Sequence, residues 1–340
     1  MRAKIIIFLL IIISLVSGIF YFYFETYYAK TGRASESIFE VKEGEGVALI
    51  ADNLKKEDLI NGKTFFFFYL KIKGIGGKII PGKYNLNGQM TIPEIAIRLT
   101  TKEEILKKDI VLTFPEGWTL EKVSQRIQKS ELQNVADFPT LAKNPAYFKE
   151  KYGYAFLGGL PQGATLEGFL FPDTYFFAPE STSEEIIKKM LDNFGRKLTA
   201  DLKAEIIQQK KTIYQIITLA SILEMEVKTQ EDREIVSGIF WSRIKIGQPL
   251  QSCATLAYVL GVNKKQYTIK DTQTVSPYNT YLNQGLPPGP IGNPGSSTLK
   301  AAIFPQNSNF NYFLSDPETS QTIFSRTFEE HTQNKFKYGL

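Results

Sequence analysis

At residues 165–175 the chain reads Thr165-Leu166-Glu167-Gly168-Phe169-Leu170-Phe171-Pro172-Asp173-Thr174-Tyr175, which sets one carboxyl group, Glu167, among large apolar side chains. If residues 167–171 are extended, Glu167, Phe169 and Phe171 lie on one face of a strand, because side chains alternate along it. A carboxyl group held against aromatic rings loses hydration, so its pKa rises and it can keep a proton near neutral pH. The stretch therefore indicates Glu167 as a candidate general acid.

Asp173 is the nearest other acidic residue, and it follows the corner at Pro172. An unbroken strand would put Asp173 roughly 20 Å from Glu167 at about 3.3 Å per residue. Pro172 is expected to bend the chain and shorten that separation. The two residues are not expected to form a tight carboxylate pair. The local pattern leaves a plainer interpretation open, in which Glu167 ends a strand and reaches solvent or a backbone N–H.

Composition narrows the chemistry that is available. The 340 residues carry a formal net charge of +5, with 43% hydrophobic and 22% charged residues, which is ordinary for a globular chain long enough for two domains. No dense Lys/Arg block indicates a nucleic-acid partner. The single cysteine, Cys253, excludes an intrachain disulfide and a thiolate metal cluster, and the single histidine, His331, excludes a His-based zinc site. We expect carboxylate chemistry without a metal or organic cofactor.

Residues 5–24 form an almost unbroken apolar run. Its length matches the roughly 20 residues with which a helix crosses a bilayer. Arg2 and Lys4 precede the run and aromatic residues crowd its other end, as expected for a cytoplasmic N-terminus and an interfacial aromatic belt. A cleaved signal peptide would normally have an apolar core of about 7–15 residues followed by a small-x-small site. We predict a cytoplasmic tail at 1–4, a transmembrane helix at 5–24, and a single-pass protein of the inner (cytoplasmic) membrane whose remaining residues are extracytoplasmic.

Residues 36–104 are predicted to form a small module. Its expected elements, in order, are a strand at 39–41, a helix at 47–54, a helix at 64–72, a strand at 78–85 and a helix at 91–99. Strand–helix–helix–strand resembles a LysM-like module, a fold that grips cell-wall glycan. The second helix carries four consecutive phenylalanines, Phe65 to Phe68, for which packing against the module's own sheet is favoured over ligand contact.

Residues 105–340 are predicted to form a larger α+β catalytic domain. Its expected first strand, 110–114, ends at Pro115-Glu116-Gly117-Trp118, where Glu116 is a rival carboxylate that we interpret as a capping group. A buried helix is expected at 212–227, with Glu224 on its apolar stripe and Glu226 pointing elsewhere. A buried Glu costs free energy without a partner. Glu224 is therefore expected either to contact sugar or support the site, or to form a structural ion pair.

Residues 276–295 contain Ser276-Pro277-Tyr278-Asn279-Thr280-Tyr281 and then a run rich in Pro and Gly, 285–295. So much Pro and Gly cannot form a helix or a central strand, so a rigid loop is predicted. Its Tyr278, Asn279 and Tyr281 suit glycan recognition, in which rings stack on sugars and amides bond hydroxyl groups. A plain surface connector is the alternative.

Four segments resemble one known family in the same order along the chain. The stretch from Glu167 to Tyr175 resembles the signature of the MltG (YceG-like) endolytic murein transglycosylases, in which the Glu is the catalytic acid/base. The others are 220–226, 250–255 and 276–295. The family usually shows Gln-Ser-Asp-Pro-Thr in the third segment, so Cys253 and Ala254 depart from it, and Cys253 cannot replace the Asp charge. The resemblance also implies a set of residues that either contact the substrate or support the residues that contact it. They are Glu224, Glu226, Gln251, Ser252, Thr255, Tyr278, Asn279 and Tyr281.

The resemblance also implies an activity. It is cleavage of the bond between N-acetylmuramic acid and N-acetylglucosamine within nascent peptidoglycan strands, which gives 1,6-anhydromuramoyl ends. Such cleavage would terminate strand elongation, and the enzyme would act beside cell-wall synthases (penicillin-binding proteins). Glu167 would protonate the leaving oxygen and then accept the proton of the C6 hydroxyl. Ordinary glycosidases need two carboxylates, whereas this reaction can use one.

Two alternatives stay open on the sequence. The first is a muramidase that hydrolyses the same bond, with Glu167 as the acid and Glu224 or Asp173 as the base. The second is a non-catalytic, membrane-tethered glycan-binding scaffold that positions synthases.

Overall fold

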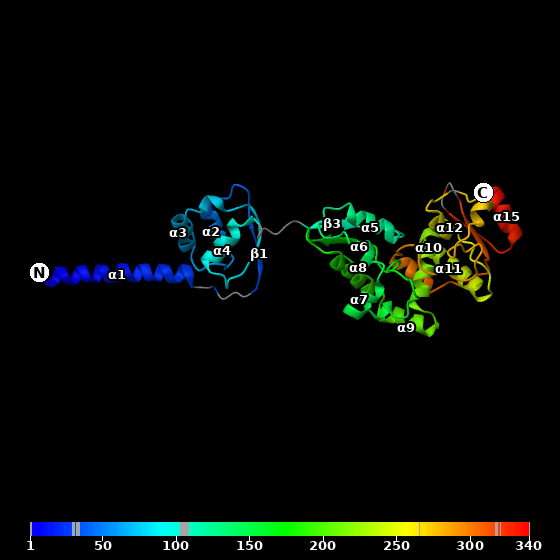
Figure 1. Cartoon of the computed structure of the whole chain (residues 1–340), viewed down its shortest axis with the longest axis horizontal. Coiled ribbons are helices and arrows are strands. Elements are labelled where there is room, and N and C mark those ends of the chain that lie inside the picture. The colour runs from blue at the N-terminus through cyan, green and yellow to red at the C-terminus, as the bar shows by residue number, and fades with distance from the viewer. Residues whose placement is uncertain are drawn as a thin grey trace. The chain divides into compact units, whose positions relative to one another are not determined.

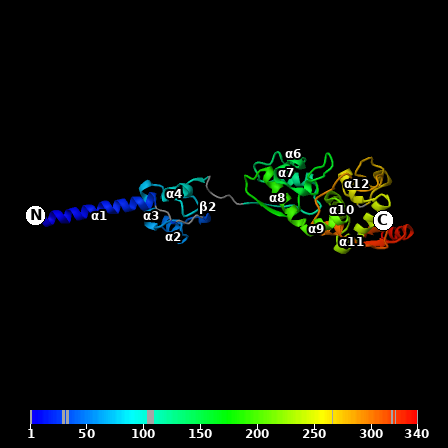
Figure 2. The same cartoon turned by 90° about the horizontal axis from the view of Figure 1, so that it is seen from below.

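The structure is a computed structural model that describes the chain except for residues 1, 29–30, 32–34, 103–108, 265, 317–318, 320 and 340. It divides into two compact units, Met1–Lys108 and Asp109–Leu340 (Figures 1 and 2). The predicted domain boundary between residues 104 and 105 lies outside the described residues. Helices and strands are mixed, in agreement with the predicted α+β class, and the described strands pair into three separate two-stranded antiparallel sheets.

The first unit contains the predicted order of strand, helix, helix, strand and helix. Its strands β1 and β2 pair antiparallel with Phe39 opposite Tyr84, and both of these rings are buried in the unit's core. The last helix begins after Thr91, close to the predicted start, with a capping box formed by Thr91 and Glu94. The elements are α1 (Arg2–Tyr27), β1 (Ser37–Val41), α2 (Val47–Lys56), α3 (Lys63–Lys73), η1 (Gly76–Lys78), β2 (Gly82–Leu86) and α4 (Ile92–Thr100).

Helix α1 is the one described helix that is long and apolar enough to cross a membrane, over Lys4–Tyr27. Its apolar side chains lie outside the core of the unit. An apolar helix of this length is compatible with a single-pass membrane anchor.

The four phenylalanines of α3 have different environments. Phe66 is fully buried in the core, and Phe65 packs against that core, as predicted for the aromatic run. Phe67 and Phe68 remain 40% and 44% exposed. The packing prediction is therefore wrong for these two rings, because consecutive helical residues point about 100° apart and cannot all face one core.

The second unit is built around helix α10, in which every residue from 216 to 223 is buried. This helix packs against α9, α11, α12 and α14, which explains why it is apolar on nearly all sides. The elements are β3 (Ile110–Thr113), α5 (Leu120–Gln128), α6 (Phe138–Leu141), α7 (Pro145–Tyr152), η3 (Ala155–Leu157), β4 (Thr174–Phe177), α8 (Ser183–Lys197), α9 (Ala200–Gln208), α10 (Ile213–Glu226), α11 (Gln230–Lys245), α12 (Cys253–Leu260), α13 (Ile269–Thr272), α14 (Ser296–Ile303), β5 (Tyr312–Ser315), β6 (Thr322–Ser325) and α15 (Phe328–Lys337).

The extended conformation expected for residues 167–171 is wrong. Glu167 lies in a turn in which the Phe169 N–H donates to the Leu166 carbonyl at 3.0 Å, and strand β4 begins only at Thr174. Gly168 makes the turn with φ +87°, a conformation that favours glycine. A Cβ atom at Gly168 would lie 2.6 Å from Ile217 Cγ2. The chain therefore turns so that it can pack directly on α10.

The environments of the α3 rings predict the effects of two matched substitutions. Phe66→Ala should destabilise the first unit by about 3–5 kcal/mol, because it leaves a cavity in a closed core. Phe67→Ala should cost no more than about 1 kcal/mol, because its ring is partly exposed. Hydrogen exchange of the β1 and β2 amides in the full-length protein would measure the difference. Equal loss of protection in both variants would contradict this description of the core.

Candidate active site

Glu167 is buried at the first turn of a helix. The side chain is 8% exposed, and its Oε1 accepts a hydrogen bond of 2.8 Å from the N–H of Leu120, the first residue of α5. Burial raises the pKa of Glu167 to about 8, and the Leu120 N–H opposes that rise by stabilising the carboxylate. The raised pKa expected from the sequence is therefore confirmed, and Glu167 can hold a proton at neutral pH.

Asn293, in the Pro/Gly-rich loop, joins three distant segments around Glu167. Its Oδ1 accepts from the Leu170 N–H at 3.0 Å, and its Nδ2 donates to the Trp118 carbonyl at 2.8 Å. Nδ2 also lies 3.5 Å from Glu167 Oε1, at the limit of a hydrogen bond. The side chain is 1% exposed. We did not select Asn293 from the sequence. The feature that could have indicated it is that Asn293 is the single polar side chain in a loop otherwise made of Pro, Gly and apolar residues.

Backbone contacts hold the same loop against the corner at residues 115–118. The N–H of Gly117 donates to the Asn293 carbonyl at 2.8 Å, and the N–H of Asn293 donates to the Trp118 carbonyl at 2.9 Å. Gly292 allows this approach, because a Cβ there would lie 2.7 Å from the Gly117 oxygen. The loop is also tied to α10, since the Ile291 N–H donates to Ser221 Oγ at 3.0 Å. Hydrogen bonds thus hold the loop to the 115–118 corner and to α10, and its rigidity stays a prediction.

Three tyrosines lie close to this loop, and Tyr214 Oη donates to the Pro288 carbonyl within it at 3.1 Å. The rings of Tyr258 and Tyr278 have centroids 5.1 Å apart, and Tyr214 stacks on Phe169 at 6.3 Å. Burial raises the pKa of Tyr258 and of Tyr278, and in both cases the negative charge of ionised Glu167 raises it further. These phenols are therefore neutral and can donate hydrogen bonds. Tyr278 was predicted as a site residue, whereas Tyr214 and Tyr258 were not.

Asp173 has partners of its own. Its Oδ1 accepts from the Thr174 N–H at 2.8 Å and its Oδ2 from Asn193 Nδ2 at 3.0 Å. The hydrogen bond from Asn193, followed by that from Thr174, lowers the pKa of Asp173. Asp173 is therefore an ionised, hydrogen-bonded group at the start of β4.

Glu224 forms a structural ion pair, one of the two roles expected for it. Oε1 lies 2.8 Å from Arg233 Nη2, while Oε2 accepts from the Gly295 N–H at 2.8 Å and from Thr298 Oγ1 at 2.5 Å. Both oxygens are thus occupied, and the side chain is 6% exposed. Glu224 fastens the end of the Pro/Gly-rich loop to α10 and α11.

Glu116 does not cap α5, so that interpretation was wrong. The N-cap is Thr119, whose Oγ1 accepts from the Lys122 N–H. The Glu116 carboxyl group instead lies against the backbone of Gly295, where a Cβ atom would overlap it. Partial desolvation and then the charge of Glu224 raise the pKa of Glu116, and Arg233 opposes them.

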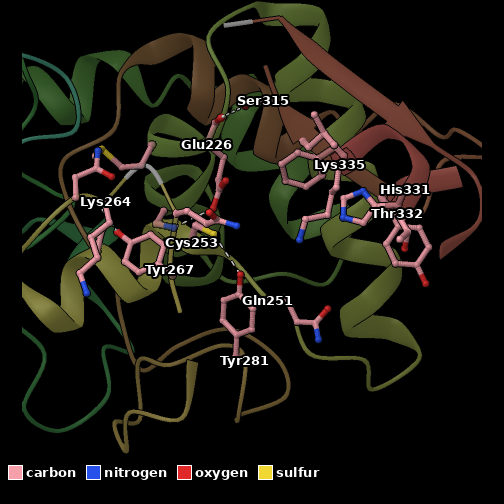
Figure 3. A pocket seen from close by; sticks show the side chains of 18 of the residues that line it. Glu226, Gln251, Cys253, Lys264, Tyr267, Tyr281, Ser315, His331, Thr332 and Lys335 are labelled. Carbon is pink, nitrogen blue, oxygen red and sulfur yellow. Dashed lines mark hydrogen bonds between the residues drawn. The ribbon is translucent and has the colours of Figure 1, made fainter. Parts of the chain in front are cut away.

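Other predicted residues line a separate cavity of about 810 Å³ at the start of α12, namely Glu226, Gln251 and Tyr281 (Figure 3). Oε1 of Glu226 accepts from the Ala254 N–H at 3.0 Å and from Ser252 Oγ, so Glu226 caps this helix. Burial raises the pKa of Glu226 against these hydrogen bonds. Neither α12 nor its capping by Glu226 was predicted from the sequence.

Cys253, where the resemblance described above implied an Asp, lines the cavity. Its Sγ lies 3.2 Å from Tyr281 Oη. Burial, followed by the charge of Glu226, raises the pKa of the Cys253 thiol, so the thiol is neutral near pH 7 and does not supply the charge of an Asp. Within the described ranges, no three His, Cys, Asp or Glu side chains form a group that could hold a metal ion.

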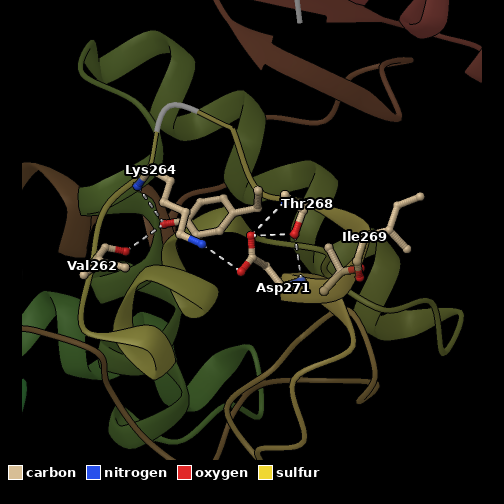
Figure 4. A network of polar contacts seen from close by, with 7 residues as sticks. Val262, Lys264, Thr268, Ile269 and Asp271 are labelled. Carbon is tan, nitrogen blue, oxygen red and sulfur yellow. Dashed lines mark hydrogen bonds and ion pairs between the residues drawn. The ribbon is translucent and has the colours of Figure 1, made fainter.

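The opposite wall of the cavity comes from the C-terminal part of the chain. His331 stacks on Tyr312 with ring centroids 5.4 Å apart and so packs within this wall, and Lys335 lies nearby in Figure 3. Lys264 and Tyr267 complete the rim. Both belong to one polar network: Lys264 Nζ lies 2.8 Å from Asp271 Oδ1 (Figure 4), and the Lys264 N–H donates to Tyr267 Oη at 3.3 Å.

The remaining predicted residues are buried beneath the loop and α12 and hold them in place through hydrogen bonds. Asn279 is fully buried, and its Nδ2 donates to the carbonyls of Thr272 and Thr274 at 3.0 and 2.7 Å. Thr255 Oγ1 and Thr280 Oγ1 lie 2.9 Å apart, and the Ser252 N–H donates to Thr280 Oγ1 at 3.0 Å. Because they are buried, these groups position the loop and α12 rather than contact a ligand.

The pKa of Glu167 predicts how stability depends on pH. A carboxyl group whose pKa rises from 4.5 to about 8 on folding stabilises the protein fully below pH 4.5, and this contribution is lost as the pH rises to about 8. Glu167→Gln keeps an acceptor for the Leu120 N–H and cannot ionise. Its free energy of unfolding relative to that of wild type should therefore increase across this window by up to a few kcal/mol, at about 1.4 kcal/mol per pKa unit, and thermal unfolding of both proteins would measure the change. Parallel melting profiles from pH 4.5 to 8 would contradict the assignment.

Asn293 provides a second prediction. Asn293→Ala removes the acceptor of a buried N–H and should cost about 1–3 kcal/mol of unfolding free energy. Asn134→Ala is the matched control, because the exposed Asn134 makes a side-chain hydrogen bond to Glu180 and its loss should cost less than about 1 kcal/mol. Denaturant unfolding of both variants measures the contrast. Equal costs would mean that Asn293 does not hold the site together.

The chain matches known proteins over most of its length. The family model described as the YceG-like family matches residues 39–337. The endolytic murein transglycosylase of Bacillus subtilis (strain 168) is 32% identical over 317 residues, which cover 88% of this chain and 83% of that protein. The protein of the same name from Streptococcus pneumoniae serotype 2 (strain D39) is 29% identical over 86% of this chain and 57% of its own length. A crystal structure of a yceG-like protein from Listeria monocytogenes is 30% identical with a TM-score of 0.59, and the match covers 90% of this chain and 100% of that one. The chain therefore belongs to the YceG-like family.

Proposed function

We propose that this protein is an endolytic murein transglycosylase in which Glu167 is the single catalytic acid/base. The observation that carries the assignment is the buried Glu167 carboxyl group, whose pKa of about 8 lets it hold a proton at neutral pH beside neutral tyrosines. Family membership supports the substrate, since the relatives that match over most of this chain are named endolytic murein transglycosylases.

The proposed reaction uses the same carboxyl group twice. Glu167 first gives its proton to the oxygen that leaves C1 of N-acetylmuramic acid, and the glycosidic C1–O bond breaks. The sugar's own C6 hydroxyl then bonds to C1 and gives its proton to the Glu167 carboxylate, which forms the 1,6-anhydro ring and restores the acid. No water is consumed. The Leu120 N–H is placed to stabilise the carboxylate between the two steps.

The partners of the other acids favour this one-carboxylate reaction over hydrolysis. A two-carboxylate glycosidase needs a second acid with a free oxygen about 5–9.5 Å from the first. Both oxygens of Glu224 are occupied by Arg233, Gly295 and Thr298, and both oxygens of Asp173 accept hydrogen bonds. Neither residue therefore has the environment of a general base, which weakens the muramidase alternative.

Sugar contacts are assigned to two places. Tyr258 and Tyr278 beside Glu167 supply ring faces and hydroxyl donors for the sugars at the cleaved bond. The cavity at the start of α12, with Gln251, Tyr281 and the Glu226 carboxyl group, is proposed to bind a further part of the glycan. Its mixture of aromatic rings and polar side chains suits carbohydrate, which offers both hydroxyl groups and apolar ring faces.

The first unit is assigned as a membrane-anchored LysM-like module. Its β1-α2-α3-β2 order and its own core support this fold, and the length and composition of α1 support an anchor in the cytoplasmic membrane. Lys4 precedes the span, which favours an extracytoplasmic location for the rest of the chain. An enzyme held there would act on nascent strands next to the cell-wall synthases that make them.

The decisive variant is Glu167→Gln in the full-length protein, purified in detergent and incubated with peptidoglycan. Mass spectrometry of the wild-type products should show muropeptides lighter by one water than the hydrolysis products. The variant should lose at least about 100-fold in rate, because general acid–base catalysis contributes roughly 10²–10⁴-fold. Glu150→Gln is the matched control, because Glu150 is an exposed carboxylate of the same unit, and its activity should not change.

Three outcomes would replace the proposal. Activity that persists in Glu167→Gln would remove Glu167 as the catalyst. Reducing ends in place of anhydro ends would identify a hydrolase. Retained glycan binding without cleavage by the wild-type protein would identify a scaffold.

A further inference from the structure

Helix α3 exposes an apolar face that the core of the first unit does not use. Phe67, Phe68 and Ile72 are 40%, 44% and 70% exposed. Phe68 and Ile72 are four residues apart and so share one side of the helix, and the rings of Phe67 and Phe68 meet edge to face at 6.0 Å. Lys71 and Lys73 in the last turn are exposed beside them.

The same helix packs against the outer part of α1. The Phe22 ring lies 5.8 Å from Phe65 and 6.5 Å from Phe68, and Tyr21 meets Phe65 at 5.7 Å. Asn61, just before α3, donates to Glu25 at 3.2 Å. Figures 1 and 2 both show α3 at the end of the unit that α1 enters. The position of α3 relative to α1 is therefore fixed by several contacts.

These contacts set the depth of α3 relative to a bilayer. The apolar run is bounded by two charged residues, Lys4 and Glu25. Tyr21 and Phe22 come 16 and 17 residues after Ile5, which is about 24–26 Å along a helix at about 1.5 Å per residue. The hydrocarbon core is about 30 Å thick. The rings of α3 that touch Tyr21 and Phe22 thus lie at the level where the acyl chains meet the headgroups.

We propose that α3 is an interfacial membrane helix, with Phe67, Phe68 and Ile72 embedded at the boundary between acyl chains and headgroups and Lys71 and Lys73 among the lipid phosphates. This inference rests on the membrane anchoring of α1 proposed above. An apolar face bordered by lysines is the composition of helices that lie in the interface plane. The apolar face of α3 is continuous with the apolar surface of α1, because the Phe68 ring packs against the Phe22 ring.

Lipid contact has a mechanical consequence for the first unit. With α1 alone in the bilayer, α1 and the unit packed on it could still tilt together relative to the membrane plane. A second contact through α3 fixes which side of the unit faces the membrane, and it leaves the β1–β2 sheet, which Figure 1 shows at the other end of the unit, turned away from the lipid. The exposed rings of α3 are then lipid contacts rather than glycan contacts.

Site-directed spin labels on the full-length protein can test this arrangement. Cys253→Ser removes the native thiol, and single cysteines are then placed by Phe68→Cys and Ile72→Cys. Ile38→Cys on β1 is the matched control, because Ile38 is also apolar and 65% exposed. Ile13→Cys, within α1, reports on the anchor itself. The labelled proteins are reconstituted in vesicles of phosphatidylethanolamine and phosphatidylglycerol, and the collision rates of each label with oxygen and with a water-soluble nickel chelate are compared.

Oxygen collects in the bilayer and the nickel chelate stays in water, so their ratio measures depth. We expect the ratio at positions 68 and 72 to exceed that at 38 severalfold and to approach that at 13. Equal ratios at 38, 68 and 72, with a membrane-like ratio at 13, would overturn the inference while leaving the anchor intact. A water-like ratio at 13 would overturn the anchor as well. Labels at 68 and 72 that are accessible to nickel and become immobile only on addition of peptidoglycan would identify a glycan-binding face instead.

Discussion

The site depends on one buried amide, that of Asn293. It holds together the corner at residues 115–118, the turn that contains Glu167 and the Pro/Gly-rich loop, which are far apart in the sequence. An amide suits this place because it both donates and accepts, and a buried group of either kind is costly without a partner. The contact also requires glycine at 292, where a Cβ atom would lie 2.7 Å from the Gly117 oxygen, and Gly117 itself has φ +76°, a conformation that favours glycine.

The same arrangement decides the ionisation of Glu167. The N–H at the start of α5 favours the carboxylate, while the surrounding protein removes water and favours the neutral acid. Desolvation is the larger effect, so Glu167 can hold and donate a proton near neutral pH. Once Glu167 has lost the proton, the Leu120 N–H stabilises its carboxylate. Glu224, two residues before the end of α10, has a different role, because Arg233, the Gly295 N–H and the Thr298 hydroxyl occupy its oxygens. The partners around each carboxyl group, and not the residue type, separate a candidate proton carrier from a structural ion pair.

Several elements could be predicted from the sequence because their signals are local. The apolar spacing of residues 212–227 predicted α10, Thr91 marked the start of α4, and the order of elements in the first unit followed from periodicity. The turn at Glu167 was missed because alternating large residues look like a strand, and only the fit of Gly168 against Ile217 requires a turn. Helix α12, with Tyr258 on one side and the cavity at its start, was missed because its N-terminal signal, the Glu226 carboxylate, comes from another helix.

The sequence by itself determined the apolar span, the absence of an intrachain disulfide, the absence of helix and strand from residues 285–295 and the choice of Glu167 as the candidate acid. These depend on composition, local spacing and resemblance. Only the tertiary structure decided that Tyr278 lies beside Glu167 while Tyr281 lines a different cavity, that Asn279 and Thr255 are buried supports, and that Asn293 is the common partner of the site. The reason is physical: burial and hydrogen-bond partners are properties of several segments together, and none of those segments specifies its partners alone.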